Sequence, residues 1–293
     1  MNIDQLTTNT SLTPVLREAD VDDLSVLVDY VTDSGDGRLT LTTSVCSQLV
    51  AAKATKSYPA AVRTAIADEI LAFGGNTLGN MVRSLRATVP FGTVLDKVLP
   101  DMNEKVSYAE VVRDVASHLK VGLSKEASVV DLETAILLKV MRESFTKMSV
   151  EERRQVIDEI GAGDTIWGPG AAAAALVAGR LSGFATYKLA TIVANSAARA
   201  LIGRGLTFAA TGGAMRALSV ALGPIGWAIT SLWTLADLSA PAYRVTVPCV
   251  LQVAYIRQKL IMQATHVTCD CGAVIPHAVK FCPECGKPAG RLA

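Results

Sequence analysis

Four cysteines crowd into the C-terminal tail, HVTCDCGAVIPHAVKFCPECGKPAGRLA, and have the residue type and spacing to hold a metal ion. They are Cys269, Cys271, Cys282 and Cys285. The second pair forms a zinc knuckle, in which two thiolates flank a tight turn. Gly286 follows it and can take the positive φ that lets backbone amides point at sulfur. The first pair has one spacer residue instead of two, although Cys271 with the following glycine matches half of a knuckle.

The shorter spacing of the first pair leaves the fourth ligand open. Either Cys269 completes a Cys₄ site with some distortion, or His266 replaces it in a Cys₃His site. We favour Cys₄, because thiolate is the better zinc ligand. Disulfide-bonded or unpaired cysteines are less favoured. A tail this short cannot form a hydrophobic core and needs a crosslink, and zinc binding can contribute on the order of 10 kcal/mol to its folding. Four protein ligands leave no position for water, so we expect one structural zinc ion.

No other group of residues in the sequence supports a reaction. His118 is the single histidine outside the tail, so it has no second histidine to pair with. The sequence also lacks the G-x-S-x-G turn of many hydrolases. We therefore expect a non-enzymatic protein.

The composition of the tail disfavours nucleic acid as a partner. Residues 264–293 hold three basic and two acidic residues, and a Cys₄ zinc centre would add negative charge. Phosphate binding requires the opposite balance, and Phe281 is the only Phe, Tyr or Trp available to stack on a base. We expect the tail to contact a protein partner or a second copy of the chain.

The N-terminal half predicts a soluble domain of short amphipathic helices with clear start signals. Three of them begin with capping boxes, in which a serine and an acidic residue satisfy orphan amides. These boxes are Ser107 with Glu110, Ser128 with Asp131, and Ser149 with Glu152. Asp20 precedes an earlier helical stripe, VDDLSVLVDYV, and further helices are expected from about Thr43 to Lys53 and from Ala60 to Phe73. Gly74 and Gly75 are expected to end the last of these.

Residues 165–263 are rich in Ala, Gly, Leu and Val, and their longest uncharged run is the 20 residues from Ala217 to Ala236. One helix of that length would span the ~30 Å core of a bilayer. Gly223–Pro224 argues against a straight helix and favours two shorter ones, at about 206–222 and 226–238. Two interpretations stay open: a buried hairpin in a helical bundle, or a hairpin that inserts into or lies on a membrane.

The net charge of +1 hides a division of the chain into three parts. Residues 1–164 hold 24 acidic and 17 basic side chains, whereas residues 165–263 hold eight basic side chains and one acidic one. Anionic lipid would attract this middle part by about 1 kcal/mol for each basic residue near the surface. We expect an acidic helical domain at 1–164, a basic apolar segment at 165–263 and a zinc ribbon at 264–293.

The cysteines and the N-terminus indicate the compartment. The first residues, MNIDQLTTNTSLTP, lack the basic and apolar stretches of a secretory signal. Cys46 and Cys249 lie far apart in apolar helical contexts and are predicted to be free, buried thiols. Free thiols and a thiolate metal site both fit a reducing compartment. We expect a cytoplasmic protein that could lie at the periphery of the inner membrane.

The segment AYRVTVPCVLQVAYIRQ, from Ala242 to Gln258, contains Pro248, where a helix is expected to start or kink. Arg257 and Lys259 are expected in its last turns, where positive charge suits the helix end. Together with FGGNTLGNMVRS and SVEERRQVIDEI upstream, this segment resembles the YaaW-like family of bacterial proteins. The resemblance covers most of residues 20–262 and implies a mostly helical fold, grouped near the ubiquinol–cytochrome c chaperones, with no particular activity. The cysteine-bearing tail departs from the shorter family members.

These observations predict a mainly α protein, a multi-helix bundle with an apolar Gly/Ala-rich helical segment and a small C-terminal zinc ribbon. The favoured function is that of a non-enzymatic cytoplasmic protein whose apolar basic helices engage a membrane surface or a protein partner. Two alternatives stay open. One is a soluble chaperone-like assembly adaptor in which the apolar segment is ordinary core, and the other is a pore-forming or toxin-like effector.

Overall fold

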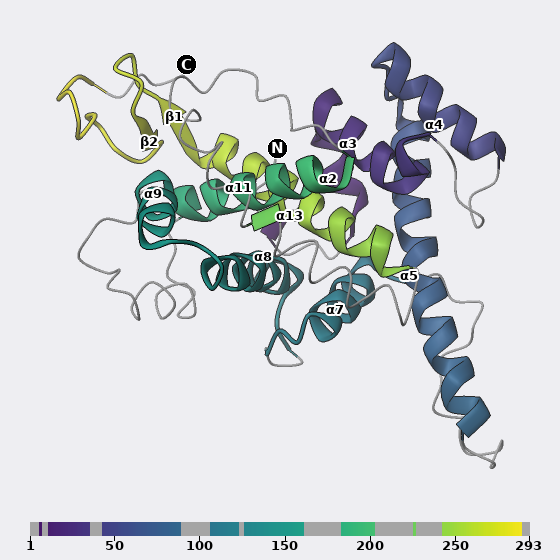
Figure 1. Ribbon diagram of the computed structural model, residues 1–293. Coiled ribbons are helices and arrows are strands. Elements are labelled where there is room, and N and C mark those ends of the chain that lie inside the picture. Colours follow the sequence, from purple (N-terminus) through teal and green to yellow (C-terminus); the bar gives the residue numbers. More distant parts are fainter. Residues whose placement is uncertain are drawn as a thin grey trace.

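The structure is a computed structural model that describes residues 6–7, 11–35, 43–88, 106–122, 126–160, 183–202, 225–226 and 242–288, without the side chains of 75–88 and Glu159. Its elements are α2 (Thr13–Glu18), α3 (Val21–Thr32), the 3₁₀ turn η1 (Asp33–Gly35), α4 (Thr43–Thr55), α5 (Ala60–Thr88), α7 (Tyr108–His118), α8 (Val129–Phe145), α9 (Val150–Ile160), α11 (Gly183–Ile202), α13 (Tyr243–Thr265), β1 (His266–Thr268) and β2 (Val274–Pro276). This part of the chain is mainly helical with one two-stranded hairpin, which confirms the predicted fold class (Figure 1).

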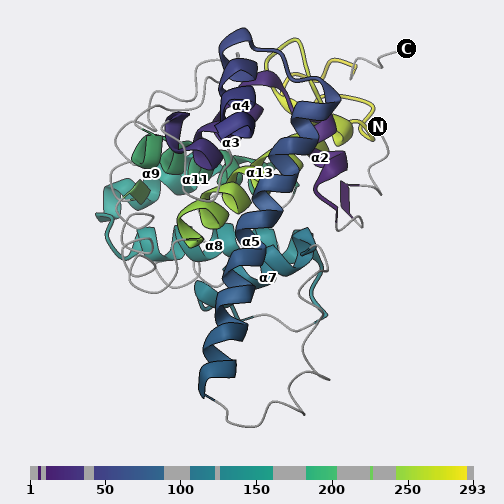
Figure 2. The same cartoon turned by 90° about the vertical axis from the view of Figure 1, so that its right-hand side faces the viewer.

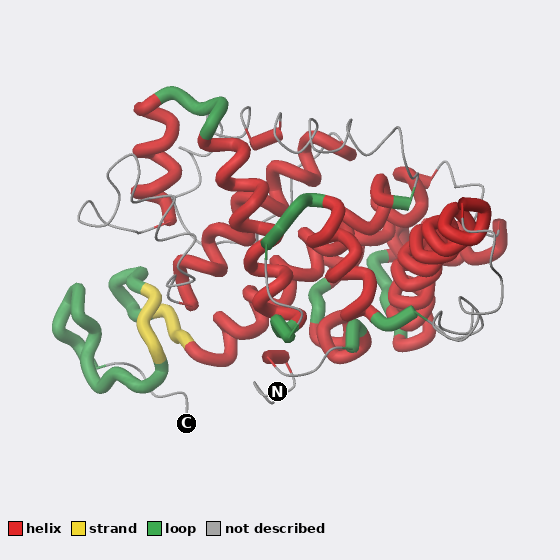
Figure 3. The backbone as a smooth tube through the Cα atoms, turned by 90° about the horizontal axis from the view of Figure 1, so that it is seen from below, coloured by secondary structure: helices red, strands yellow, loops and turns green. Residues whose placement is uncertain are grey.

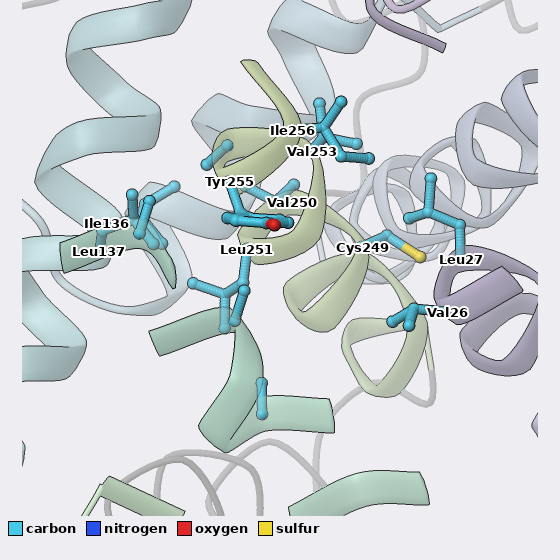
Figure 4. Packing of buried hydrophobic residues seen from close by; sticks show 14 of the residues in the cluster. Val26, Leu27, Ile136, Leu137, Cys249, Val250, Leu251, Val253, Tyr255 and Ile256 are labelled. Atoms are coloured by element: carbon cyan, nitrogen blue, oxygen red, sulfur yellow. The ribbon is translucent and has the colours of Figure 1, made fainter. Parts of the chain in front are cut away.

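Helix α13 lies at the centre of the helical body. It contacts α2, α3, α5, α7, α8 and α11. Cys249 of α13 faces Val26 and Leu27 of α3, while Ile136 and Leu137 of α8 lie on the opposite side, and all five are buried (Figure 4). A helix surrounded on every side is apolar all round rather than along one stripe, which explains the run VTVPCVLQVAYI.

One hydrophobic core joins helices from both sides of residue 164. Its buried residues come from α3, α5, α7 and α8 as well as from α11 and α13. Helix α11 is buried without interruption from Leu189 to Ala198 and packs along α13 (Figure 1). The described helices of the basic apolar segment are therefore core elements of the same body as the acidic helices.

The remainder of that segment is not described by the structure. Of the run from Ala217 to Ala236, only Ile225 and Gly226 are described, so the two helices predicted at 206–222 and 226–238 lie outside the described residues. Among the helices that are described, none combines the length and the apolarity needed to cross a bilayer.

The structure confirms the helix starts predicted after Asp20, at the three capping boxes and at about Thr43. The carboxylate of Asp20 accepts a hydrogen bond from the amide of Asp23 at 2.9 Å, and α3 begins directly after it. The capping boxes that open α7 and α8 are complete. At α9, the amide of Glu152 donates to the hydroxyl of Ser149, and the amide of Ser149 donates to the carboxylate of Glu152. The helix predicted from Thr43 is present as α4.

The prediction that Gly74 and Gly75 end a helix is wrong, because α5 runs without a break from Ala60 to Thr88. Its C-terminal half extends beyond the other helices (Figure 2). Gly74 serves packing instead, since a Cβ at this position would lie 2.4 Å from Cγ2 of Val111 on α7. The absent side chain lets the two helices approach closely, although glycine inside a helix costs about 1 kcal/mol of helix propensity.

Substitution of this glycine should therefore destabilise the protein. We expect Gly74→Ala to lower the free energy of unfolding by about 1–3 kcal/mol, the usual effect of overpacking. Urea unfolding followed by circular dichroism measures the change. Gly122→Ala is the matched control, because no atom lies within 4 Å of a Cβ built there. Val111→Ala in the Gly74→Ala background should recover part of the loss, and an additive double variant would contradict the packing explanation.

The expected positions of the charged residues on α13 are also wrong. The helix starts at Tyr243, before Pro248, and ends at Thr265. Arg257 and Lys259 thus lie away from its last turn and do not stabilise the helix end; both bind carboxylates of the N-terminal helices. Helical periodicity could not reveal these pairs, because the partners are distant in the sequence.

Arg257 is fully buried at the centre of a polar network. Its Nε donates to Oε2 of Glu133 at 2.7 Å and its Nη2 donates to Oε1 at 3.2 Å. Its Nη1 donates to the carbonyl oxygen of Leu6 at 2.8 Å, and the Tyr108 hydroxyl donates to Glu133 at 2.9 Å. Buried charges are tolerated when they are paired and hydrogen-bonded. The network ties α13 to α7, α8 and the N-terminal segment.

Lys259 forms a second ionic contact between α13 and α3. Its ammonium donates to Oδ2 of Asp23 at 2.8 Å and also contacts the carboxylate of Asp20. Burial raises the pKa of Asp23 to about 7, although the charge of Lys259 opposes the rise. The folded protein therefore holds a proton on Asp23 more tightly than the unfolded chain, where the pKa is near 3.8.

This difference predicts a pH dependence of stability. Between about pH 4 and pH 7 the folded state binds more protons at Asp23 than the unfolded state does, so the free energy of unfolding falls as the pH rises. Asp23→Asn has no charge to titrate and should flatten this part of the profile. Urea unfolding at pH 4.5 and 7.5 measures the slope for each protein. The two conditions are about three pH units apart, which is close to the difference between the folded and unfolded pKa of Asp23. Equal slopes in the two proteins would contradict the prediction.

Candidate metal centre

The four cysteines lie in a ribbon that begins directly where α13 ends. Strands β1 and β2 pair antiparallel, with Val267 opposite Ile275, and enclose the first cysteine pair. Phe281 and Pro288 form an isolated antiparallel bridge that encloses the second pair. The ribbon projects from one end of the helical body (Figure 3). Each cysteine pair thus occupies the turn of its own hairpin, as zinc knuckles do.

The fold brings the four sulfur atoms to one point. All four lie within 4.8 Å of one another. Cys269 and Cys285 have sulfurs 3.6 Å apart, and so have Cys271 and Cys282. Zn–S bonds of about 2.3 Å in a tetrahedron require S–S separations of about 3.8 Å, so this set of donors fits one tetrahedral ion. Cys269 and Cys282 are buried, whereas Cys271 and Cys285 are exposed.

The two turns reach the same arrangement from different spacings. In the first turn the amide of Gly272 donates to the carbonyl of Cys269 at 2.8 Å, and in the second the amide of Gly286 donates to the carbonyl of Cys282 at 2.9 Å. The first turn closes over one residue fewer, which accommodates the single spacer. Gly272 and Gly286 have φ of +89° and +71°, so both positions need glycine for backbone conformation. The conformation predicted for Gly286 is confirmed.

Backbone amides favour the thiolate form of Cys282. Hydrogen bonds from the amides of Cys285 and Glu284 lower the pKa of the Cys282 thiol to about 7, against the effect of burial. The backbone therefore favours the charged form of this one sulfur, which is the form that binds a cation.

His266 does not join the sulfurs. Its Nδ1 lies 2.7 Å from the hydroxyl of Thr265, and its ring lies 6.4 Å from that of Phe184 on α11. Burial lowers the pKa of the His266 ring. Of the two alternatives for the fourth ligand, the structure places Cys269 with the other cysteines.

Hydrogen bonds fix the ribbon to α13. The amide of His277 donates to the carbonyl of Thr265 at 2.9 Å, and its Nε2 donates to the carbonyl of His266 at 2.8 Å. Because no linker separates Thr265 from β1, the central helix of the body carries the ribbon directly (Figure 1).

The ribbon has a core of its own that is very small. Its buried residues are Cys269, Ile275 and Cys282, and they form a cluster separate from the main core. Three buried side chains cannot hold a hairpin pair together in water, so a crosslink between the turns is needed for stability.

A second group of titratable residues lies between α7 and α13. The Tyr243 hydroxyl donates to Asp114 at 3.0 Å, and the His118 ring stacks on Tyr243 with centroids 3.8 Å apart. Burial raises the pKa of Asp114 and lowers that of His118. Among the described residues, only the four cysteines form a group of three or more potential metal ligands, so this trio is assigned to helix packing.

Neither Cys46 nor Cys249, the two cysteines outside the ribbon, is in a disulfide. Cys249 is buried in the main core, as predicted, whereas Cys46 on α4 is only half-buried. The buried pair of Arg257 and Glu133 was not predicted from the sequence, where the only signal for it was a charge inside an otherwise apolar helical run.

Comparison with known proteins identifies relatives. A UPF0174 protein of Helicobacter pylori strain J99 is 34% identical over 196 residues, which cover 66% of this chain and 70% of the relative. A UPF0174 protein of H. pylori strain 26695 is 31% identical over 201 residues, 67% of this chain and 87% of the relative. The UPF0174 protein YaaW of Escherichia coli K12 is 27% identical over 205 residues, 69% of this chain and 73% of the relative.

No protein-family model matches the chain, and no solved structure matches it. The names of the relatives state a family and no activity. Their identities and coverage agree with the resemblance drawn from the sequence segments, and the chain belongs to the UPF0174 family, the family of YaaW.

Proposed function

We propose that this protein is a non-enzymatic binding protein in which a zinc-stapled ribbon, residues 266–288, docks a protein partner onto a helical body. The observation that carries the proposal is the cluster of four thiols at the end of α13. Zinc is the metal proposed because four thiolates at tetrahedral spacing select it, and its role is structural because four protein ligands leave no position for water. Thiolate ligands require reduced cysteines, so the proposal places the protein in the cytoplasm.

The position of the ribbon supports a docking role. It is hydrogen-bonded to the end of the central helix, so a partner bound to it would be held in a fixed orientation to the body. Phe281 on the ribbon is 61% exposed. An exposed aromatic ring on a rigid element is the kind of residue that anchors protein interfaces, and a partner with an apolar pocket would bury it.

Site-specific photo-crosslinking tests this role. A benzophenone side chain at Phe281 should give a discrete protein adduct in cells, and the same group at Val150 should not. Val150 is the matched control because it is 62% exposed and lies on α9 of the body. Cys271→Ser in the Phe281 background should abolish the adduct, since it removes a metal ligand. Identical adducts from both positions, or adducts that survive Cys271→Ser, would overturn the proposal.

A membrane-surface role of residues 165–263 is the second candidate, and the excess of basic side chains there favours it. Against it, α11 and α13 are core helices, which supports the alternative in which the apolar segment belongs to a soluble adaptor. Flotation with liposomes that contain or lack phosphatidylserine separates the two. Flotation that requires the anionic lipid would support the membrane role, and dye release from the same liposomes would support a pore-forming effector.

A further inference from the structure

The sulfurs of the two turns lie in contact with one another. Two separations across the turns are 3.6 Å, from Cys269 to Cys285 and from Cys271 to Cys282. Each pair therefore crosses from the turn of one hairpin to the turn of the other. Each pair also combines one exposed sulfur with one buried sulfur, because Cys271 and Cys285 are exposed while Cys269 and Cys282 are buried.

We propose that the ribbon is a site of reversible oxidation by hydrogen peroxide, in which two cross-ribbon disulfides, Cys269–Cys285 and Cys271–Cys282, replace the zinc ion. The inference rests on the zinc site of the proposed function. It adds a chemical substrate, the peroxide, and a second crosslinked state of the ribbon.

The exposed and buried sulfurs have different parts in the reaction. Peroxide reaches the exposed thiolate of Cys271 or Cys285, which attacks one oxygen, breaks the O–O bond and becomes a sulfenic acid. The buried thiolate 3.6 Å away then attacks that sulfur, and the hydroxyl group leaves as water after taking up a proton. Each disulfide formed thus consumes one peroxide and two protons and yields two water molecules. Loss of all four thiolates releases the divalent ion.

The crossed pairing determines what happens to the fold. A disulfide between the two turns crosslinks the two hairpins as the zinc ion does, so the ribbon remains crosslinked after the ion has left. Bonds within a turn, between Cys269 and Cys271 or between Cys282 and Cys285, would leave the hairpins unconnected. Because the ribbon core is small, such a ribbon would lose its order.

The test begins with the zinc content of the purified reduced protein. Peroxide is then added in steps, and released zinc is measured with a colorimetric chelator. We expect release of the whole zinc content after about two peroxide molecules for each chain, and recovery of binding after dithiothreitol and zinc are added. Cys46→Ser should respond as the wild type does, because Cys46 lies on α4 outside the ribbon.

Mapping of the disulfides tests the pairing directly. Trypsin cleaves after Lys280 and separates Cys269 and Cys271 from Cys282 and Cys285. Lys287 precedes proline and is not cleaved, so crossed disulfides should keep residues 260–280 joined to residues 281–291 without reductant, and fragmentation should assign the two bonds. Separate peptides, sulfinic or sulfonic products, or zinc that stays bound would overturn the inference while the zinc site stands. Reduced protein without zinc would instead overturn the proposed function.

Discussion

Replacing Cys282 with serine is expected to abolish zinc binding and unfold the ribbon while the helical body stays folded. The ribbon depends on the metal because only three of its side chains form a buried cluster, and zinc contributes on the order of 10 kcal/mol to domains of this kind. The body has its own core, in which no ribbon residue takes part. Elemental analysis should find no zinc, and amide hydrogen exchange should become fast in residues 266–288 but stay slow in Val250–Ile256 of α13.

Two controls make this prediction specific. Cys46→Ser should retain the zinc and the slow exchange of the ribbon, since Cys46 is remote from the centre. Wild-type protein treated with a strong chelator should reproduce the Cys282→Ser exchange pattern. A chelated ribbon that stays as protected as before would show that the ion does not fold it.

Removing the charge of Glu133 should have a large effect on the stability of the helical body. Glu133→Gln keeps the shape of the side chain and leaves the Arg257 guanidinium fully buried without a counter-charge. Loss of one partner of a buried ion pair costs about 3–5 kcal/mol. Chemical unfolding followed by circular dichroism should show a fall of this size in the free energy of unfolding.

The same helix provides the matched control. Glu143 of α8 pairs with Lys139 one turn away, on the surface, at 2.8 Å. Glu143→Gln should cost less than about 1 kcal/mol, because exposed ion pairs contribute little. A double variant, Glu133→Leu with Arg257→Met, removes both buried charges and should recover most of the loss seen in Glu133→Gln. Equal effects at the buried Glu133 and the partly exposed Glu143 would show that burial of the pair does not matter.

Local signals in the sequence were read correctly where the physics is local. A capping box satisfies amides within three residues, so Ser107, Ser128 and Ser149 identified their helices without any tertiary information. The conformation of Gly286 was predicted for the same reason, because a turn around a thiolate pair imposes its backbone conformation on the residue that follows.

Gly74 shows where local reasoning fails. Glycine after an amphipathic run is a common helix end, but this one is set by a neighbour, since Val111 of α7 fills the space that a side chain would need. The same limit applies to Arg257, whose partners Glu133 and Leu6 belong to segments far away in the sequence. The position of the charge within α13 did not distinguish a helix-end contact from a buried ion pair.

The sequence by itself determined the helical class, most helix starts and the four cysteines of the candidate metal centre, because residue type and short spacing fix each of these. Only the tertiary structure decided that α13 is the central helix, that the basic apolar segment contributes α11 and α13 to one core with the acidic helices, and that Cys269 rather than His266 joins the other sulfurs. Each of these outcomes depends on which surfaces meet, and that depends on packing between residues distant in the chain.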